Sequence, residues 1–210
     1  MEIDDKAEEA LRYSAKAVLR KRARALRSTI PAPALAERSR LIEAALARLP
    51  ELAAAGAVAL FWPIDGKSEV DLRALDASLR ARGARVAYPS IDPDTRVMTF
   101  RFVADPFTMA ERGLGFLEPA ASDEEAALLD VIVVPALQLD PTGYRIGYGA
   151  GFYDRALPRF APPARKVGVG YDFQLIPEVP VTEGDVPVDA IVTDARVIEI
   201  VPSACGSQQA

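Results

Sequence analysis

A glycine-rich turn is the part of this sequence best suited to chemistry. Gly147, Gly149 and Gly151 alternate with larger residues, between an apolar run at 131–137 and a segment from Phe152 that is typical of a helix start. Glycines let the backbone approach a ligand closely, and a helix start adds unpaired N–H groups and a partial positive charge. These features together predict a phosphate site.

An aspartate lies just inside the same predicted helix. Asp154 would repel a bare phosphate at this position. A carboxylate suits a phosphate that carries a magnesium ion, because Mg²⁺ prefers oxygen ligands and shares them with substrate phosphates. The turn and the aspartate therefore favour a site for a phosphate bound together with magnesium.

The chain contains no histidine. Its absence excludes Ser-His-Asp and Cys-His catalysis as well as metal centres with histidine ligands. Acid–base work would fall to Asp, Glu, Lys or Tyr, and any metal would be a hard cation held by carboxylates and phosphate oxygens. The composition thus favours chemistry driven by charge and positioning, such as phosphoryl transfer.

The bulk composition is that of an ordinary globular protein. The 210 residues are 50% hydrophobic and 26% charged, and the net charge of −5 argues against nucleic acid as a partner. The apolar runs are too short for a membrane span, and the charged N-terminus is not typical of a secretory signal. Cys205 is the single cysteine, which excludes a disulfide within the chain. We expect a cytoplasmic protein without a membrane partner.

Helical patterns alternate with short apolar strands along the chain. Helices are expected at 4–28, after Pro33, after a capping box at 68–71 and from Phe152 until the proline-containing segment 158–163, with a short helix after Pro106. Strands are expected at 57–62, 85–88, 97–103 (an edge strand), 131–137, 166–171, 189–193 and 196–201. This order predicts an α/β fold with three layers, in which helices cover both faces of a mostly parallel, Rossmann-like sheet. We expect one domain over 1–202 and a disordered tail at 203–210.

Two familiar nucleotide motifs match only in part. Residues 66–68 (Gly-Lys-Ser) resemble the end of a P-loop, but Phe61 stands where that motif needs its first glycine. The glycine turn also resembles a dinucleotide fingerprint, with Asp172 as its ribose-binding acid, but Phe152 stands at the third glycine position. An NAD-dependent oxidoreductase therefore remains an alternative.

Several segments, taken in order, resemble one family. These segments are 16–20, Glu69 after 63–66, 115–119, 144–155, 179–180 and 185–193. They resemble 5-formyltetrahydrofolate cyclo-ligase, also called methenyltetrahydrofolate synthetase, and the glycine turn with its Tyr-Asp-Arg end is the most specific of them. The resemblance implies a fold similar to the NagB/RpiA/CoA-transferase-like fold. It also implies an enzyme that uses ATP and Mg²⁺ to convert 5-formyltetrahydrofolate into 5,10-methenyltetrahydrofolate, releasing ADP and phosphate.

The chemistry implied by the resemblance suits these residue types. A formamide oxygen is a poor leaving group, and transfer of the γ-phosphoryl group to it would create an activated, imidate-like phosphate. The neighbouring folate nitrogen could then attack, close the five-membered ring and expel phosphate. The protein would align two ligands and neutralise charge.

The resemblance also implies roles for individual residues. Those for ATP are Lys16, Arg20, Arg145, Ile146, Gly147, Tyr148, Gly149, Ala150, Gly151, Phe152 and Tyr153. Those for the folate are Glu69, Phe61, Trp62 and Tyr153. Arg145 and Tyr153 are the catalytic candidates, and Asp154 and Asp185 are the magnesium ligands.

Structural alternatives stand beside these roles. Lys16 and Arg20 share a helix face that could simply be solvated, Glu69 could belong to the capping box, and Tyr153 could be a core aromatic residue. The chain also departs from the family at Gly184, where a histidine is frequent.

The second departure from the family is at position 150. Ala150 replaces a glycine or a basic residue, which shifts phosphate binding toward Arg145. A folate- or nucleotide-binding protein without catalysis is a further alternative. We expect small-molecule partners and a monomer or weak homodimer.

Overall fold

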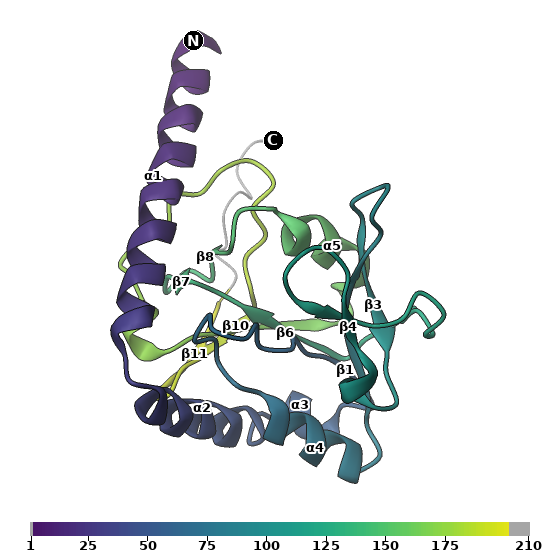
Figure 1. Ribbon diagram of the computed structural model, residues 1–210. Helices are drawn as coiled ribbons and strands as arrows, with labels where there is room; N and C mark the ends of the chain where they lie inside the picture. Colours follow the sequence, from purple (N-terminus) through teal and green to yellow (C-terminus); the bar gives the residue numbers. More distant parts are fainter. Residues whose placement is uncertain (1, 202–210) are drawn as a thin grey trace, which may run out of the picture.

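A seven-stranded sheet forms the centre of the computed structural model, which describes residues 2–201 (Figure 1). In spatial order its strands are β11 (Val197–Glu199), β10 (Ala190–Val192), β9 (Arg165–Val169), β6 (Val131–Pro135), β1 (Ala57–Ala59), β2 (Arg85–Ile91) and β3 (Met98–Phe102). The five strands from β10 to β2 pair in parallel, and β11 and β3 pair antiparallel at the two edges. The predicted mostly parallel sheet and the edge strand near 97–103 are therefore confirmed.

Helices cover both faces of this sheet. The helices are α1 (Glu2–Thr29), α2 (Ala32–Leu46), α3 (Pro50–Ala54), α4 (Arg73–Ala81) and α5 (Phe152–Phe160), with 3₁₀ turns η1 (Pro106–Thr108) and η2 (Asp172–Gln174). Figure 1 shows α2, α3 and α4 together on one face, α5 on the other, and α1 standing along the side near β8. Two small ribbons complete the fold: β4 (Ala110–Glu111) with β5 (Leu117–Glu118), and β7 (Gln138–Leu139) with β8 (Arg145–Ile146).

The central strand β6 shows why both faces need a cover. Val131 and Val133 pack into the core beneath α2, α3 and α4, whereas Ile132 and Val134 pack into the core beneath α5. Successive side chains of a strand point to opposite faces, so a run of four apolar residues divides between two cores. Burial of each such side chain stabilises the fold by about 1.5–3 kcal/mol.

One local prediction is wrong and another is confirmed. The capping box at 68–71 does not form: Ser68 has a left-handed φ of 55°, and α4 begins only at Arg73. The predicted end of the helix that follows the glycine turn is confirmed, because α5 ends at Phe160, within the segment 158–163; Pro158 lies inside its last turns. Leu157 and Phe160 are buried on either side of that proline, and their packing stabilises the last turn despite the missing N–H group.

Two further expectations concern the C-terminal tail and membrane spans. The predicted disordered tail at 203–210, which includes Cys205, lies outside the described residues. Among residues 2–201, no helix combines the length and the apolar character that crossing a membrane requires.

Candidate active site

The residues with predicted roles gather at the carboxyl edge of the parallel strands. Trp62 and Glu69 follow β1, and the glycine turn follows β6 through the β7–β8 ribbon. The 182–186 segment precedes β10 but packs against the helix α1 and the start of α5. Ligands of open α/β sheets bind at this edge, because the loops that leave neighbouring parallel strands meet there.

The backbone of the glycine turn needs glycine at two positions. Gly149 has a φ of +106° and Gly151, which caps α5, a φ of +65°, both in the left-handed region. A Cβ atom built on Gly149 would lie 3.2 Å from Cζ of Arg20. A Cβ atom on Gly147 would meet nothing within 4 Å. The glycine at 147 thus leaves open space beside the turn, as a ligand would require.

Basic residues of α1 reach across to this turn. Nε of Arg20 donates to the carbonyl oxygen of Gly147 at 3.2 Å, and Nη2 of Arg24 donates to that of Tyr148 at 3.2 Å. Lys16 is buried, donates to Oγ1 of Thr182 at 2.7 Å and forms an ion pair with Asp185. A solvated basic face is therefore wrong for Lys16.

A buried ion pair joins Arg145 to Asp154. The side chain of Arg145 is only 4% exposed, and its Nη2 donates to Oδ1 of Asp154 at 2.8 Å. Its Nη1 donates to the carbonyl oxygen of Val186, whose own N–H donates to the same Asp154 oxygen at 3.2 Å. A buried cation needs such partners, because its desolvation is otherwise too costly. The pair fixes the orientation of the aspartate at the start of α5.

The two aspartates predicted to bind magnesium each keep one oxygen available. Asp154 uses Oδ1 for its protein contacts, and Asp185 uses Oδ2 for Lys16 and Thr182. The second oxygen of each forms no hydrogen bond or ion pair with residues 2–201. Within the same range, no group of three or more potential ligand side chains lies together. This donor set fits Mg²⁺, which binds through one or two carboxylates and takes its other ligands from phosphate and water.

Glu69 is held by the glycine turn rather than by a helix start. Its Oε2 accepts the backbone N–H of Ile64 at 2.8 Å, and its Oε1 accepts the hydroxyl of Tyr148 at 2.8 Å. Glu69 therefore does not belong to a capping box, and instead it contacts Tyr148 of the glycine turn. Each carboxylate oxygen keeps a second lone pair for a ligand donor.

Aromatic residues line the same region. Trp62 is half-buried and meets Tyr88 and Phe107 edge-to-face, with ring centroids 5.9 and 5.7 Å apart. Phe61 is buried in the hydrophobic core beneath α2, α3 and α4. The ring of Tyr153 packs near Phe100, at a centroid distance of 6.3 Å. Trp62 is thus the more accessible of the two adjacent aromatic residues.

The hydroxyl of Tyr153 is buried and has no hydrogen-bond partner in the described part of the chain. An unpaired buried donor costs about 1–3 kcal/mol. Burial raises the pKa of this phenol, and the nearby Glu69 charge raises it further. Tyr153 is therefore a neutral donor, and a ligand acceptor would recover its lost hydrogen bond.

The sequence did not identify Arg27 and Thr182 as parts of this site. Arg27 is buried, and its Nη2 donates to the hydroxyl of Tyr148 at 2.5 Å. A usable signal was the spacing of Arg20, Arg24 and Arg27, which places the three on one side of a helix. Thr182 carries no such signal, because its contact spans 166 positions.

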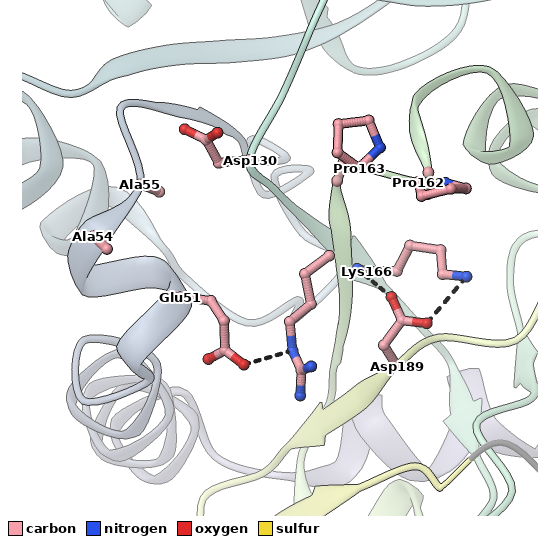
Figure 2. Close-up of a pocket in the computed structure, with 11 residues that line it drawn as sticks. Glu51, Ala54, Ala55, Asp130, Pro162, Pro163, Lys166 and Asp189 are labelled. Atoms are coloured by element: carbon pink, nitrogen blue, oxygen red, sulfur yellow. Dashed lines mark hydrogen bonds and ion pairs between the residues drawn. The ribbon is translucent and has the colours of Figure 1, made fainter.

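A pocket of about 610 Å³ lies at the opposite, amino edge of the sheet (Figure 2). Its charged groups contact one another or the backbone. Nε of Arg165 lies 3.0 Å from Oε1 of Glu51, and Nζ of Lys166 lies 3.1 Å from Oδ1 of Asp189. Asp130 accepts the N–H groups of residues 56 and 57. None of the residues with predicted roles lines this pocket.

Known proteins resemble this chain over most of its length. The 5-formyltetrahydrofolate cyclo-ligase family matches residues 12–194. The 5-formyltetrahydrofolate cyclo-ligase of Escherichia coli K12 is 32% identical over 155 residues, which cover 71% of this chain and 84% of that protein. That of Mycolicibacterium smegmatis is 38% identical over 94 residues, which cover 43% and 48%.

Solved structures show the same fold. The NMR structure of Aquifex aeolicus 5,10-methenyltetrahydrofolate synthetase has a TM-score of 0.77 and 30% identity, covering 93% of this chain and 96% of that one. The Mycoplasma pneumoniae 5,10-methenyltetrahydrofolate synthetase has a TM-score of 0.68 and 23% identity, covering 85% and 98%.

Proposed function

Because the chain belongs to the 5-formyltetrahydrofolate cyclo-ligase family, and is therefore a ligase that forms a carbon–nitrogen bond, we propose that it converts 5-formyltetrahydrofolate into 5,10-methenyltetrahydrofolate. ATP is the co-substrate, Mg²⁺ is the metal, and ADP and phosphate are released. The family match over residues 12–194 carries the proposal. The role of ATP is supported by the glycine turn, which Arg20 and Arg24 contact and which lies near Asp154 and Asp185. The protein acts in the cytoplasm on small molecules.

The glycine turn binds the triphosphate of ATP. Backbone N–H groups of residues 146–153 face the phosphates, and the open space beside Gly147 admits them. Arg20 and Lys16 contribute positive charge from α1, and Arg145 contributes it from β8. Because Ala150 has no charged side chain, these three residues neutralise the phosphates.

Asp154 and Asp185 hold the metal through their available oxygens. When bound, Mg²⁺ reduces the negative charge of the transferring phosphoryl group. Arg145 orients Asp154 through its ion pair, and Lys16 orients Asp185 in the same way. Both carboxylates are therefore positioned before the ligands arrive.

Glu69, Trp62 and Tyr153 bind the folate, with Phe61 supporting Trp62 from the core. The Glu69 carboxylate accepts hydrogen bonds from the amino and ring N–H groups of the pterin. Trp62 packs against its plane, and the unpaired hydroxyl of Tyr153 donates to the formyl group or to the phosphate formed on it. Arg145 and Tyr153 thus act at the reacting atoms, one as a fixed cation and the other as a neutral donor.

The reaction proceeds in two displacements. The formyl oxygen accepts the γ-phosphoryl group, and ADP leaves. The neighbouring folate nitrogen then attacks the formyl carbon and loses its proton. The bond between that carbon and the phosphorylated oxygen breaks, and phosphate leaves with the oxygen. The site aligns both ligands and excludes water from the activated intermediate.

The oxidoreductase alternative receives no support from Asp172. Nε and Nη2 of Arg196 bind its two carboxylate oxygens at 2.8 and 2.9 Å, and the hydroxyl of Thr193 donates to it at 2.9 Å. The acid that would bind a ribose is thus engaged by protein groups.

One absorbance assay tests the proposal against both alternatives. Protein, 5-formyltetrahydrofolate, ATP and Mg²⁺ are mixed, and the ultraviolet absorbance of methenyltetrahydrofolate is followed. We expect product only when ATP and Mg²⁺ are both present. Folate binding without product would support a non-catalytic binding protein, and reduction of NAD with a hydroxy substrate would support an oxidoreductase.

A further inference from the structure

Tyr148 connects the glycine turn to Glu69. Its hydroxyl donates to Oε1 of Glu69 at 2.8 Å and accepts from Nη2 of Arg27 at 2.5 Å. Its backbone carbonyl accepts from Arg24, whose guanidinium lies 5.2 Å from the centre of the tyrosine ring. One residue of the predicted nucleotide loop is therefore bonded to the residue predicted to hold the pterin.

The direction of these hydrogen bonds is fixed by chemistry. A guanidinium only donates and a carboxylate only accepts, so the one phenolic proton of Tyr148 points to Glu69. Burial raises the pKa of Tyr148 to about 12, and the Glu69 charge adds to the effect. The phenol is protonated at neutral pH and remains a donor.

Arg27 makes this arrangement a bridged ion pair. The residue is 4% exposed, and it forms no ion pair with a carboxylate among residues 2–201. Its Nε is also buried without a partner in that range. Glu69, on the other side of the tyrosine hydroxyl, therefore supplies countercharge to the buried guanidinium. A change in the position of Tyr148 alters the surroundings of both charges.

We propose that Tyr148 is a positioning residue that couples folate binding at Glu69 to nucleotide binding at the glycine turn. This inference rests on the proposed function. A nucleotide that orders the turn also fixes the hydroxyl that orients Glu69. Binding of the first ligand costs the conformational entropy of ordering the turn and Glu69, so the second ligand binds more tightly. The same increase in affinity is expected whichever ligand binds first.

The test is Tyr148→Phe, which removes the hydroxyl and keeps the ring beside Arg24. Dissociation constants of 5-formyltetrahydrofolate are measured with and without a non-hydrolysable ATP analogue and Mg²⁺. We expect the analogue to tighten folate binding to the wild-type protein about fivefold or more. In Tyr148→Phe we expect this ratio to fall close to one. The KM for the folate should rise about fivefold, more than kcat falls.

Tyr144→Phe is the matched control, because its hydroxyl forms no hydrogen bond within residues 2–201. It should keep the wild-type ratio. An unchanged ratio in Tyr148→Phe, or a wild-type ratio of one, would overturn the role of Tyr148 while leaving the proposed function intact. A wild-type protein that binds no 5-formyltetrahydrofolate would refute the proposed function, and this inference with it. Thermal unfolding of each variant checks that a changed ratio does not reflect loss of the fold.

Discussion

The carboxyl and amino edges of the sheet both gather charged side chains but hold them in different ways. At the amino edge, Arg165 pairs with Glu51 and Lys166 pairs with Asp189 around an open pocket. At the carboxyl edge, the hydroxyl of Tyr153 and Nε of Arg27 are buried without partners in the described part of the chain. Nε of Arg165 is likewise buried without a hydrogen bond, so the two edges differ in charge pairing rather than in unpaired atoms. Arg165 lies 3.0 Å from a Glu51 oxygen, whereas Arg27 forms no ion pair with a carboxylate among residues 2–201.

This difference shows that the volume of a cavity is a poor guide to function here. The pocket of about 610 Å³ contains none of the residues for which the sequence predicts chemistry. A buried polar group that remains unpaired costs free energy, and a ligand that pairs with it would remove that cost. The unpaired hydroxyl of Tyr153 lies among the residues for which the sequence predicts chemistry, and this coincidence supports a binding site at the carboxyl edge.

The largest effect on activity is expected when one carboxylate oxygen at the carboxyl edge is replaced by an amide nitrogen. Asp154→Asn removes a carboxylate charge at the carboxyl edge, but its amide oxygen still accepts from Arg145. We expect the protein to fold and kcat to fall roughly 100-fold or more, because the metal loses a charged ligand. Product absorbance under saturating ATP, folate and Mg²⁺ measures the loss.

Asp189→Asn is its counterpart at the amino edge. It weakens the pair with Lys166 and should cost about 1 kcal/mol of stability or less, with kcat within about twofold of wild type. Equal losses of activity in the two variants would remove the distinction between the edges.

Two alanine substitutions in the glycine turn sharpen the comparison. Gly147→Ala adds a methyl group that meets no protein atom within 4 Å, so stability should change by only about 0.5 kcal/mol. A bound triphosphate would meet that methyl group, and the KM for ATP should rise about tenfold or more. Gly149→Ala should also lower stability by about 1–3 kcal/mol, because φ is +106° there. Chemical denaturation and steady-state kinetics on both variants check this, and an unchanged KM in Gly147→Ala would contradict it.

A smaller effect is expected from α1. Arg20→Ala removes the donor to the carbonyl of Gly147 and a cation beside the turn, and the KM for ATP should rise about tenfold. Arg22→Ala, on the exposed side of the same helix, is the control and should leave the KM within about twofold. If both variants match the wild-type protein, Arg20 does not belong to the site.

The smallest effect concerns stability at high pH. Burial raises the pKa of Tyr148 from 10.0 to about 12, so the folded state binds its proton more tightly than the unfolded state. This stabilisation is fully present below pH 10 and is lost as the pH rises toward 12. Thermal midpoints between about pH 9 and 11 should therefore fall less steeply in Tyr148→Phe than in the wild-type protein. If the thermal midpoints of the two proteins fall equally steeply with pH, folding does not raise the pKa of Tyr148.

Much of the fold could be predicted from local patterns. Periodicity located most helices and strands because burial on one or two faces imposes it, as in the run of β6. The glycine turn was also visible, since Gly149 and Gly151 take backbone conformations that other residues rarely adopt. Such features depend on neighbours in the chain, which the sequence displays directly.

Partners across the fold could not be predicted in the same way. Glu69 and Ser68 matched a capping box by local spacing, yet Glu69 bonds to Tyr148, 79 positions away. Lys16 reaches Asp185 across 169 positions, and the spacing of basic residues on α1 does not specify that partner. These contacts depend on how the elements pack, so the pairing within the site became visible only in the structure.

A crystal structure with a non-hydrolysable ATP analogue and Mg²⁺ tests the central claim most directly. We predict density for the triphosphate within hydrogen-bonding distance of the backbone at Gly147, Gly149 and Gly151, with the metal against Asp154. Density in the amino-edge pocket beside Asp130, with the glycine turn unoccupied, would contradict this account.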